Sequence, residues 1–376
     1  MTDPETREVA LVTVEDIARK YDFGAGHPLR PERVLLTYDL IHRLGLTRLP
    51  GVSEVASRAA TDGEILAVHA LEFVEAVKMI DAGALDGHRG YGFGLGTQDD
   101  PIFPEMHSAS AAVCGASLTA AELVAGGTVG TAFNPAGGLH HARRAEASGF
   151  CIYNDPAVAI ARVLEMHPDW RVAYIDVDVH HGDGVQWIFY DEPRVLTISL
   201  HQSGRFLYPG TGFEDEIGSG AATGTAINVP LPPFTGNDDY LWALDEVVGR
   251  ALPAFQADLL VTQLGADTHH RDPLANLGLT MPAYPEMART LARAASLCGG
   301  RWVATGGGGY QAETVVPKVW TIHFAEMCGA AERVPPEWLE DAAPEDVSRP
   351  WPGEVRSSVD GVLDATVPRL ESLAAS

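Results

Sequence analysis

Short runs of apolar residues alternate along the chain with longer stretches in which apolar residues recur at helical spacing. The apolar runs, each typical of a buried strand, are 9–14, 128–133, 171–179, 194–200, 258–266 and 301–307. The stretch 238–255 repeats apolar residues at Leu241, Leu244, Val248 and Leu252, which form one face of a helix. Strands that alternate with helices predict a single α/β domain with a mostly parallel sheet covered on both faces.

The segment 154–167 predicts another helix, with Asp155 as its N-cap and Pro156 at the first helical position. At Val334 the character changes to a stretch rich in proline and acidic residues, followed by a last helical pattern. We therefore divide the chain into a main domain, 1–333, and a C-terminal extension, 334–376, that packs on the main domain or trails from it. All reactive residues discussed below precede the extension, so we expect it to be dispensable for the chemistry.

The charge of the chain narrows the classes of function. Its 376 residues carry a formal charge of −25, and the one short basic run is 141–145. Proteins that bind nucleic acids normally present a basic face, so direct binding of DNA or RNA is not expected. The negative charge favours a cationic substrate or partner, although it could equally serve solubility alone.

The four cysteines, Cys114, Cys151, Cys298 and Cys328, form no CxxC pair, which indicates unpaired thiols in a reducing compartment. The first residues lack the basic-then-apolar pattern of a secretion signal. We find no apolar run of the roughly 18 residues needed to cross a bilayer. We therefore expect a cytoplasmic protein without a membrane partner; its oligomeric state is not indicated.

The segment 175–184, IDVDVHHGDG, places three aspartates and two histidines directly behind an apolar run. Burying an ionised group costs several kcal/mol unless the group is paired with an opposite charge or binds a metal. Side chains of a strand alternate between its faces, so Asp176, Asp178 and His180 point one way and the intervening apolar residues the other. They lie at the C-terminal end of the strand, where open α/β sheets form ligand sites. A buried hydrogen-bonded network with a structural role alone is the alternative.

A metal ion would offset the charge of these carboxylates. Asp178 and His180 could supply an oxygen and a nitrogen ligand, and a catalytic zinc site takes three protein ligands and keeps one position open. The third ligand should follow another strand. The apolar run 258–266 ends directly before Asp267, which we predict in this role.

Two further strand ends carry reactive groups. His140 and His141 stand in a glycine-rich loop after the run 128–133, and the run 301–307 leads into four glycines followed by Tyr310. Taken alone, a histidine pair is more often a surface or structural feature, and a glycine run is usually a turn. Their joint position after strands of one sheet indicates a common site.

With these residues the chain resembles the histone deacetylase family, most closely its bacterial branch, the acetoin-utilisation deacetylases. The matching segments occur in the family's order between about residue 19 and residue 310: YDFGAGHPLRPERV, PAGGLHHARRAEASGFCIYND, IDVDVHHGDG, YPGTG, QLGADTHHRDP and GGGGY. The resemblance implies the arginase/deacetylase fold, in which helices flank a parallel sheet of about eight strands. It also implies hydrolysis of the acetyl group of Nε-acetyl-lysine in proteins, with a link to acetoin or acetate metabolism.

The resemblance implies roles for individual residues. Asp178, His180 and Asp267 would bind the divalent metal, in agreement with the argument from the strand face, and this ligand set accommodates Zn²⁺ or Fe²⁺. The residues implied in catalysis are His140 with its partner Asp176, His141 with its partner Asp183, and Tyr310, which would hydrogen-bond the substrate carbonyl. A structural K⁺ is implied at Asp176, Ser199 and the carbonyls of Asp178, His180 and Leu200.

The resemblance also implies a narrow channel for an aliphatic chain. Phe150 and Tyr208 would form its walls, with Phe more usual in the family at the second position, and Leu274 and Gly308 would complete the lining. Asp99 is the expected rim carboxylate that holds the substrate backbone, although the adjacent Asp100 is an alternative.

Three other interpretations remain. The first is a binuclear manganese ureohydrolase of the same fold, but Gly265 stands where such enzymes carry a second aspartate, and only His269 flanks Asp267 on the other side. The second is a non-catalytic acyl-ligand binder, although every residue needed for catalysis is present. The third shares the chemistry but acts on acetylpolyamines or other small acetylated amines, and the sequence hardly separates it from a protein-lysine deacetylase.

Overall fold

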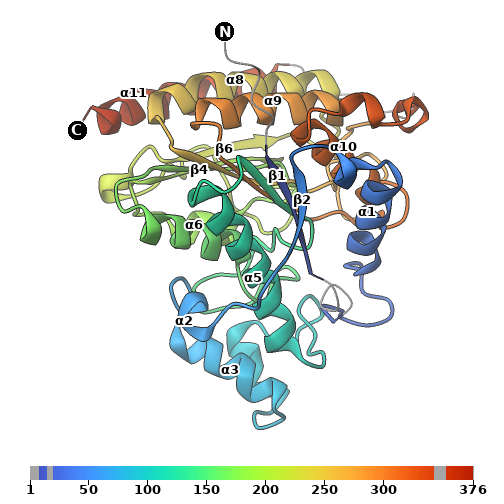
Figure 1. Cartoon of the computed structure of the whole chain (residues 1–376). Coiled ribbons are helices and arrows are strands. Elements are labelled where there is room, and N and C mark those ends of the chain that lie inside the picture. The colour runs from blue at the N-terminus through green and yellow to red at the C-terminus, as the bar shows by residue number, and fades with distance from the viewer. Residues whose placement is uncertain (1–7, 15–19, 343–352, 376) are drawn as a thin grey trace.

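Parallel strands form one central sheet of eight, and helices cover both of its faces (Figure 1). The computed structural model describes residues 8–14, 20–342 and 353–375. The strands are β1 (Val9–Thr13), β2 (Val52–Ala56), β3 (Thr131–Asn134), β4 (Val172–Asp176), β5 (Val195–Gln202), β6 (Ala226–Leu231), β7 (Leu259–Gln263) and β8 (Trp302–Thr305). Their order across the sheet is β2-β1-β3-β8-β7-β4-β5-β6. The predicted fold class is confirmed.

The helices in the described part of the chain are α1 (Glu32–Arg43), α2 (Asp62–Ile65), α3 (Leu71–Asp81), α4 (Gly87–Gly90), α5 (Met106–Ala125), α6 (Asp155–Met166), α7 (Asp183–Ile188), α8 (Asn237–Phe255), α9 (Ala283–Leu297), α10 (Val316–Met327) and α11 (Glu354–Ala374). Short 3₁₀ turns are η2 (Leu46–Arg48), η3 (Tyr91–Phe93), η4 (Gly220–Ala222), η5 (Ala331–Arg333) and η6 (Pro336–Leu339).

The two faces of the sheet bury two separate cores. Ala173 and Ile175 of β4 pack in the core shared with α8, α9, α10 and α11, whereas Val172 and Tyr174 face the core shared with α3, α5 and α6. In Figure 1, α8, α9 and α11 lie above the sheet, and α5 and α6 lie below it. The alternation expected of a strand is therefore confirmed in β4.

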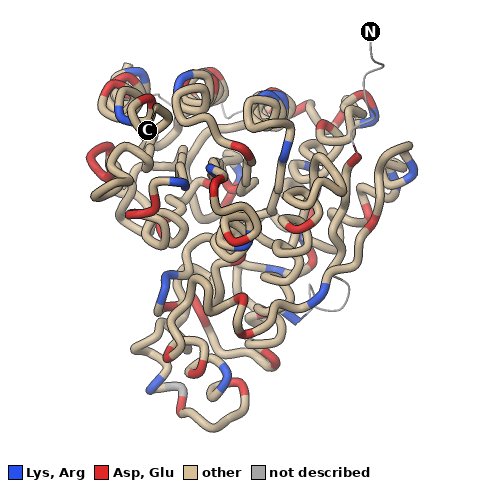
Figure 2. The backbone as a smooth tube through the Cα atoms, turned by 60° about the vertical axis from the view of Figure 1, so that its left-hand side comes forward, with Lys and Arg blue, Asp and Glu red and all other residues tan. Residues whose placement is uncertain are grey.

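Charged residues are spread over the molecule rather than gathered by sign. The chain has 26 Lys and Arg against 51 Asp and Glu. Figure 2 shows the basic residues scattered among acidic ones along the backbone.

Two strands were not predicted, and most of the predicted strands are shorter than expected, β4, β7 and β8 most of all. β2 is an edge strand with Ser53 and Glu54 exposed, so it lacks an apolar run. β6 contains Pro230, which a sheet tolerates at its edge, where β6 lies. β4 ends at Asp176 rather than continuing to residue 179. Beyond it the chain leaves the sheet, although Val177 still donates its N–H to the Gln263 carbonyl.

The predicted N-cap of α6 was wrong by one residue. Asn154 is the N-cap, and its side chain accepts the Ala157 N–H at 3.0 Å. Asp155, the first helical residue, is fully buried and accepts the backbone N–H of Leu139 at 2.8 Å. An asparagine and an aspartate in sequence both suit an N-cap, so the pattern alone does not separate them.

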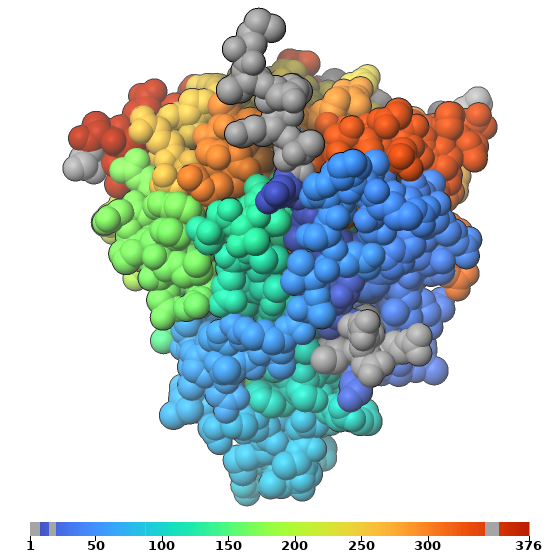
Figure 3. Space-filling model, in the orientation of Figure 1, coloured from blue at the N-terminus to red at the C-terminus, as the bar shows by residue number. Residues whose placement is uncertain are grey.

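Helix α5 is long enough to cross a membrane, although polar residues interrupt its sequence and it forms no continuous apolar run. This helix has 20 residues and is apolar enough to cross a membrane by length and composition, but 78% of its apolar window is buried in the protein. Below it, α2 and α3 belong to a lobe that protrudes from the body of the molecule (Figure 3). We therefore describe α5 as a core helix that joins this lobe to the sheet.

The C-terminal extension packs on the main domain. Val355, Val359, Leu363 and Leu370 of α11 belong to the same apolar core as the sheet, and α11 lies along α8 in Figure 1. The Arg171 side chain also donates to a carbonyl of the helix, that of residue 373, at 2.9 Å. The division at residue 333 stays a prediction, but helix α11, the larger described part of the extension, packs against the main domain.

Candidate active site

The reactive residues follow the carboxyl ends of strands that are neighbours in the sheet, β3, β8, β7 and β4. Parallel strands end at the same edge, so the loops that follow them converge there. These residues, in the order of the strands, are His140 and His141, Tyr310, Asp267, and Asp178 with His180. The sheet thus collects residues that are far apart in the sequence.

Asp178, His180 and Asp267 form a compact set of three buried ligand groups. One ligand atom of each lies within 4.8 Å of the others. His180 Nδ1 is 3.1 Å from an oxygen of Asp178 and 3.2 Å from an oxygen of Asp267. Two carboxylates and one imidazole fit a divalent ion such as zinc or ferrous iron, whose charge would offset the buried negative charge.

The surroundings of these groups orient them and shift their pKa values. Burial opposes the charged imidazole, but hydrogen bonds to Asp178 and Asp267 outweigh it and raise the pKa of His180 to about 10. Burial and the negative charge of Asp178 raise the pKa of Asp267 to about 8. Gln263 Nε2 and the Gly308 N–H both donate to Asp178 Oδ2, at 2.6 and 2.7 Å. Such donors fix the direction in which a ligating oxygen points.

His140 and His141 are both buried, and each ring is held by its own carboxylate. His140 Nδ1 donates to Asp176 and His141 Nδ1 donates to Asp183, each at 2.7 Å. Burial would lower the pKa of His140, but the charges of Asp176 and Asp178 raise it to about 9. Burial and the nearby His140 lower the pKa of His141 to about 4. Adjacent groups whose pKa values are pushed apart are suited to different roles in proton transfer.

A narrow channel of about 200 Å³ leads to these groups. Its lining residues are Asp99, His141, Gly149, Phe150, His180, Leu207, Tyr208, Leu274 and Tyr310. The Phe150 ring centroid lies 5.7 Å from that of Tyr310, and the Tyr208 centroid 5.1 Å from that of His141. Phe150 has a φ of 69°, rare for a bulky residue. Tyr21 secures this backbone by donating to the Phe150 carbonyl at 2.9 Å.

Asp99, predicted at the rim of the channel, and Gly308, predicted in its lining, lie in different surroundings. Asp99 is exposed and lines the channel, whereas Asp100 is only 2% exposed, so Asp99 is the carboxylate placed at the rim. Gly308 does not line the channel but lies against the buried carboxylates. A Cβ at this position would come 2.1 Å from an oxygen of Asp267, which explains the need for glycine.

The comparison with known proteins decides the family. The histone deacetylase domain matches residues 27–327. The chain belongs to the histone deacetylase family. The acetoin utilization protein AcuC of Bacillus subtilis (strain 168) is 44% identical over 85% of this chain and 82% of that protein. The AcuC protein of Staphylococcus aureus (strain MSSA476) is 36% identical over the same shares.

A solved structure described as an HDAC homologue complexed with SAHA matches with a TM-score of 0.80 at 30% identity, over 96% of this chain and 100% of that chain. Both the family and the fold implied by the sequence motifs are thereby confirmed.

Arg33 of α1 is a residue of this deacetylase site that sequence reasoning missed. It is 4% exposed and donates to the carbonyls of Gly307 at 2.7 Å and Gly309 at 3.2 Å, so it holds the loop that leads to Tyr310. The Trp320 ring lies 5.2 Å from its guanidinium carbon. Its signal was a charged residue within the RPERV segment, but its partners are 274 and 276 positions away.

The side chain of Asn154 was also missed. Besides capping α6, it donates to the carbonyls of His140 at 3.0 Å and Ala142 at 2.9 Å. It thereby ties the loop that carries the histidine pair to the start of α6. The segment that carries the family resemblance includes this residue, but its role depends on contacts across the fold.

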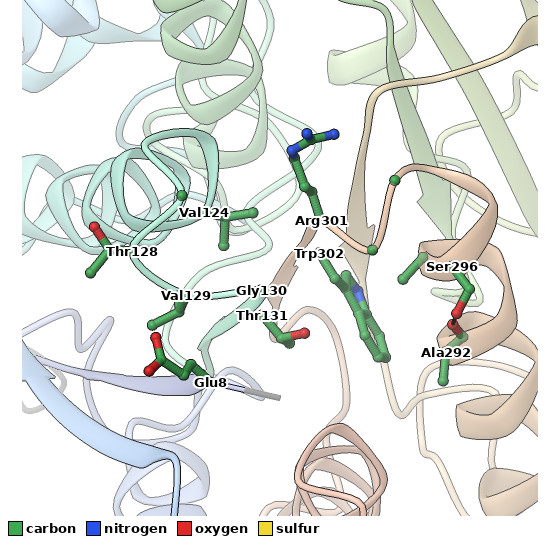
Figure 4. A pocket seen from close by; sticks show the side chains of 14 residues that line it. Glu8, Val124, Thr128, Val129, Gly130, Thr131, Ala292, Ser296, Arg301 and Trp302 are labelled. Carbon is green, nitrogen blue, oxygen red and sulfur yellow. Dashed lines mark hydrogen bonds between the residues drawn. The ribbon is translucent and has the colours of Figure 1, made fainter. Parts of the chain in front are cut away.

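A larger cleft, about 700 Å³, opens at the amino edge of the sheet (Figure 4). Glu8, Thr131 and Arg301 are among its lining residues. The Arg301 guanidinium is already engaged, because it lies 4.7 Å from the Trp170 ring and donates to the Asp258 carbonyl. None of the predicted site residues lines this cleft. Size alone therefore does not locate the chemistry in this molecule.

Proposed function

We propose that the chain is a metal-dependent amidohydrolase that removes acetyl groups from Nε-acetyl-lysine of proteins. The observation that carries this proposal is the channel of about 200 Å³ that brings His141, His180 and Tyr310 together. Its rings and Leu274 suit the aliphatic part of an acetylated lysine, whose amide would reach the three polar groups. Asp99, which lines the channel and is exposed, would accept an N–H of the substrate backbone.

The metal we propose is Zn²⁺ or Fe²⁺, held by Asp178, His180 and Asp267. When bound, it supplies positive charge that acidifies a water molecule and polarises the amide carbonyl. The ligand set supports this, because three buried groups with two carboxylates need a cation to offset their charge.

The geometry disfavours a second metal of the ureohydrolase type. A side chain at position 265 would come 2.3 Å from an oxygen of Asp178. His269 turns away from this site, with its Nε2 atom 2.8 Å from Asp341. A single divalent ion next to the channel is therefore our proposal.

The residues of the chain would carry the proton transfers. His141 lines the channel, and its Nδ1 donates to Asp183, so its Nε2, which lies 3.1 Å from His140 Nε2, is the nitrogen that would take a proton from water. His140, deeper and held by Asp176, would stay charged and stabilise the negative charge that develops. The Tyr310 hydroxyl would donate to the oxygen of the amide as it becomes anionic. A histidine then returns a proton to the leaving amine.

Further features of the proposal follow from the family. A structural K⁺ is proposed at Asp176, Ser199 and the carbonyls of Asp178, His180 and Leu200. Its support is that Asp176 and Ser199 are register partners on β4 and β5. We also propose that the enzyme is cytoplasmic, acts on an acetylated protein or amine, and contacts neither nucleic acid nor membrane directly.

A substrate panel tests the proposal. The purified protein, loaded with Zn²⁺ or Fe²⁺, would be assayed on acetyl-lysine peptides and on acetylpolyamines, with His141→Ala as the control for contaminating deacetylases. We expect kcat/KM to be higher for the peptides. A preference for acetylpolyamines would favour the small-amine alternative, and an absence of amide hydrolysis with either metal would show that the proposed activity is wrong.

A further inference from the structure

Asp341 of the C-terminal extension lies against the loop that follows β7. It comes just after η6, and its side chain is 5% exposed. One oxygen is 2.8 Å from His269 Nε2 and accepts the Met281 N–H at 3.2 Å. The other accepts from the Arg271 guanidinium at 2.8 Å. A single buried carboxylate thus collects donors from the loop and from the start of α9.

This loop also carries parts of the active site. It begins at Asp267, one of the proposed metal ligands. The Asp272 N–H donates to the His269 carbonyl at 2.8 Å. Asp272 in turn accepts the backbone N–H of Tyr310 at 2.8 Å and that of Leu274 at 3.0 Å. The loop therefore connects a metal ligand, a channel wall and the position of the Tyr310 phenol.

His269 links Asp341 to the interior of the loop. Its Nε2 donates to Asp341, and its Nδ1 accepts the Arg271 N–H at 3.2 Å, so both ring nitrogens are used. The ring is 1% exposed and stacks on Tyr284 with the centroids 6.2 Å apart. The Tyr284 hydroxyl contacts the Ala266 carbonyl at 3.4 Å, one residue before Asp267. Displacement of Asp341 would therefore leave His269 without its Nε2 partner and weaken its hold on the loop and on Tyr284.

His269, His270 and Asp341 are also close enough together to offer ligands to a second metal ion. Ligand atoms of His269, His270 and Asp341 lie within 4.8 Å of one another. However, the Arg271 guanidinium is 2.8 Å from Asp341 and already neutralises its charge. A cation there would meet this positive charge, and three of the about four lone-pair sites of Asp341 already accept from His269, Arg271 and the Met281 N–H. The hydrogen bonds to Asp341 therefore hold this cluster together without a metal ion.

We propose that Asp341 is a positioning residue of the deacetylase, through which the C-terminal extension holds the 267–274 loop and hence Tyr310 in place. This proposal rests on the function proposed above and deepens it. It also revises our expectation that the extension is dispensable for the chemistry, because Asp341 lies within the extension although it contacts no substrate.

Asp341→Asn tests this role, with Glu340→Gln as the matched control. Both changes remove one negative charge, but Glu340 is exposed. An asparagine retains only one acceptor oxygen and presents an N–H₂ group to a donor. For Asp341→Asn we expect kcat to fall roughly 10- to 100-fold with KM nearly unchanged, the scale of a displaced catalytic group. Glu340→Gln should behave as wild type in the same assay.

A double variant separates positioning from stability. In a Tyr310→Phe background the hydroxyl is absent, so Asp341→Asn should lower kcat by less than about threefold. A full additional fall, equal to that in the wild-type background, would mean that Asp341 does not act through Tyr310. If Asp341→Asn does not fold, Arg271→Gln replaces it as the test variant. Arg271 is 56% exposed, so its substitution should be tolerated, and the change removes one hydrogen-bond donor to the Asp341 carboxylate.

Hydrogen exchange of the loop provides a readout that does not depend on activity. The Asp272 N–H should exchange faster in Asp341→Asn than in Glu340→Gln. Unchanged exchange together with wild-type kcat would overturn the proposal, and so would a wild-type protein with two metal ions per chain that loses one in Asp341→Asn. If the wild type hydrolyses no acetyl-lysine peptide, the proposed function fails, while the exchange experiment still tests the hold of Asp341 on the loop.

Discussion

The Nε2 atoms of His140 and His141 lie 3.1 Å apart, while each ring donates from Nδ1 to a different buried carboxylate. Only one of the two facing nitrogens can carry the proton between them. His141 lines the channel, and His140 does not. The neighbouring rings therefore differ in their access to a substrate, even though they are adjacent in the sequence and both buried.

This difference predicts unequal losses when each histidine is removed. His141→Ala should lower kcat by roughly 10³-fold, within the range of a lost general base. His140→Ala should cost roughly 10- to 100-fold, because only its electrostatic contribution is lost. Steady-state kinetics on an acetyl-lysine peptide would measure both, with metal content as the control. A larger loss in His140→Ala would reverse the assignment of the base.

The metal prediction concerns Asp267, the ligand farthest in sequence from the other two. Asp267→Asn should lose most of the bound metal, since an amide oxygen is a weaker ligand than a carboxylate. Phe150→Ala serves as the control, because it should keep the metal and raise KM by removing a channel wall. Chelation should abolish activity, and Zn²⁺ or Fe²⁺ should restore it. Normal metal content in Asp267→Asn would show that the third ligand is another residue.

What the sequence revealed of the site depended on the distance over which its residues act. Asp178 and His180 were predictable because they alternate with the apolar residues Val177 and Val179, a pattern that continues beyond the end of β4. Asp267 was predictable because it directly follows an apolar run. Arg33 and Asp341 were not, because their functions depend on partners 70 or more positions away. A periodic pattern reports the face of an element but not which distant loop lies against that face.

The same limit applied to the fold. The six strands that were predicted are buried apolar runs, and β2 and β6 were missed because both are edge strands. An edge strand contacts one neighbour only, so it can carry Glu54 or Pro230 without cost to the sheet. Only the resemblance to the family supplied the correct number of strands.

Asp99 at the channel mouth and the buried Asp100 next to it should respond differently to substitution. Asp99→Ala should raise KM for a peptide roughly tenfold, the scale of one lost hydrogen bond to a charged group. It should matter less for an acetylpolyamine, which has no peptide backbone. Burial and the charge of Asp99 raise the pKa of Asp100 to about 8, so Asp100→Asn replaces a mostly neutral group and should leave KM unchanged. An effect on KM from Asp100→Asn alone would move the rim role to that residue.

His323 in α10 predicts a dependence of stability on pH. Its side chain is fully buried, and neither ring nitrogen has a hydrogen-bond partner among the described residues. Burial lowers its pKa to about 3. An unfolded chain would bind a proton at this residue below about pH 6.5, whereas the folded chain would not. The contribution of the uncharged His323 to the free energy of unfolding is therefore fully present above about pH 6.5. It is lost as the pH falls from about 6.5 towards 3.

His323→Leu should raise the free energy of unfolding at neutral pH by about 1–2 kcal/mol, since it removes an unsatisfied buried polar group. It should also weaken the loss of stability between pH 7 and pH 5. Urea unfolding at both pH values would measure this, with the exposed His88→Leu as the control. A variant whose stability falls with pH as steeply as that of the wild type would contradict the argument.

Tyr310→Phe separates catalysis from binding. The ring lines the channel and lies 6.4 Å from the His180 ring between centroids, and its backbone N–H is held by Asp272. Phenylalanine keeps the ring and these backbone contacts and removes only the hydroxyl. That hydroxyl should meet the substrate oxygen most strongly once the oxygen becomes anionic, so the contact belongs chiefly to the transition state.

We therefore expect Tyr310→Phe to lower kcat by roughly 10²- to 10³-fold, the scale of one lost oxyanion donor, with little change in KM. Metal content should stay the same, because the phenol is not a ligand. Hydroxamates, which bind a metal directly, should still inhibit the binding of substrate, though more weakly. If Tyr310 only closes the glycine loop by packing, the variant should instead be less stable with near-normal turnover. A wild-type kcat would remove Tyr310 from the mechanism, whatever happens to the melting temperature.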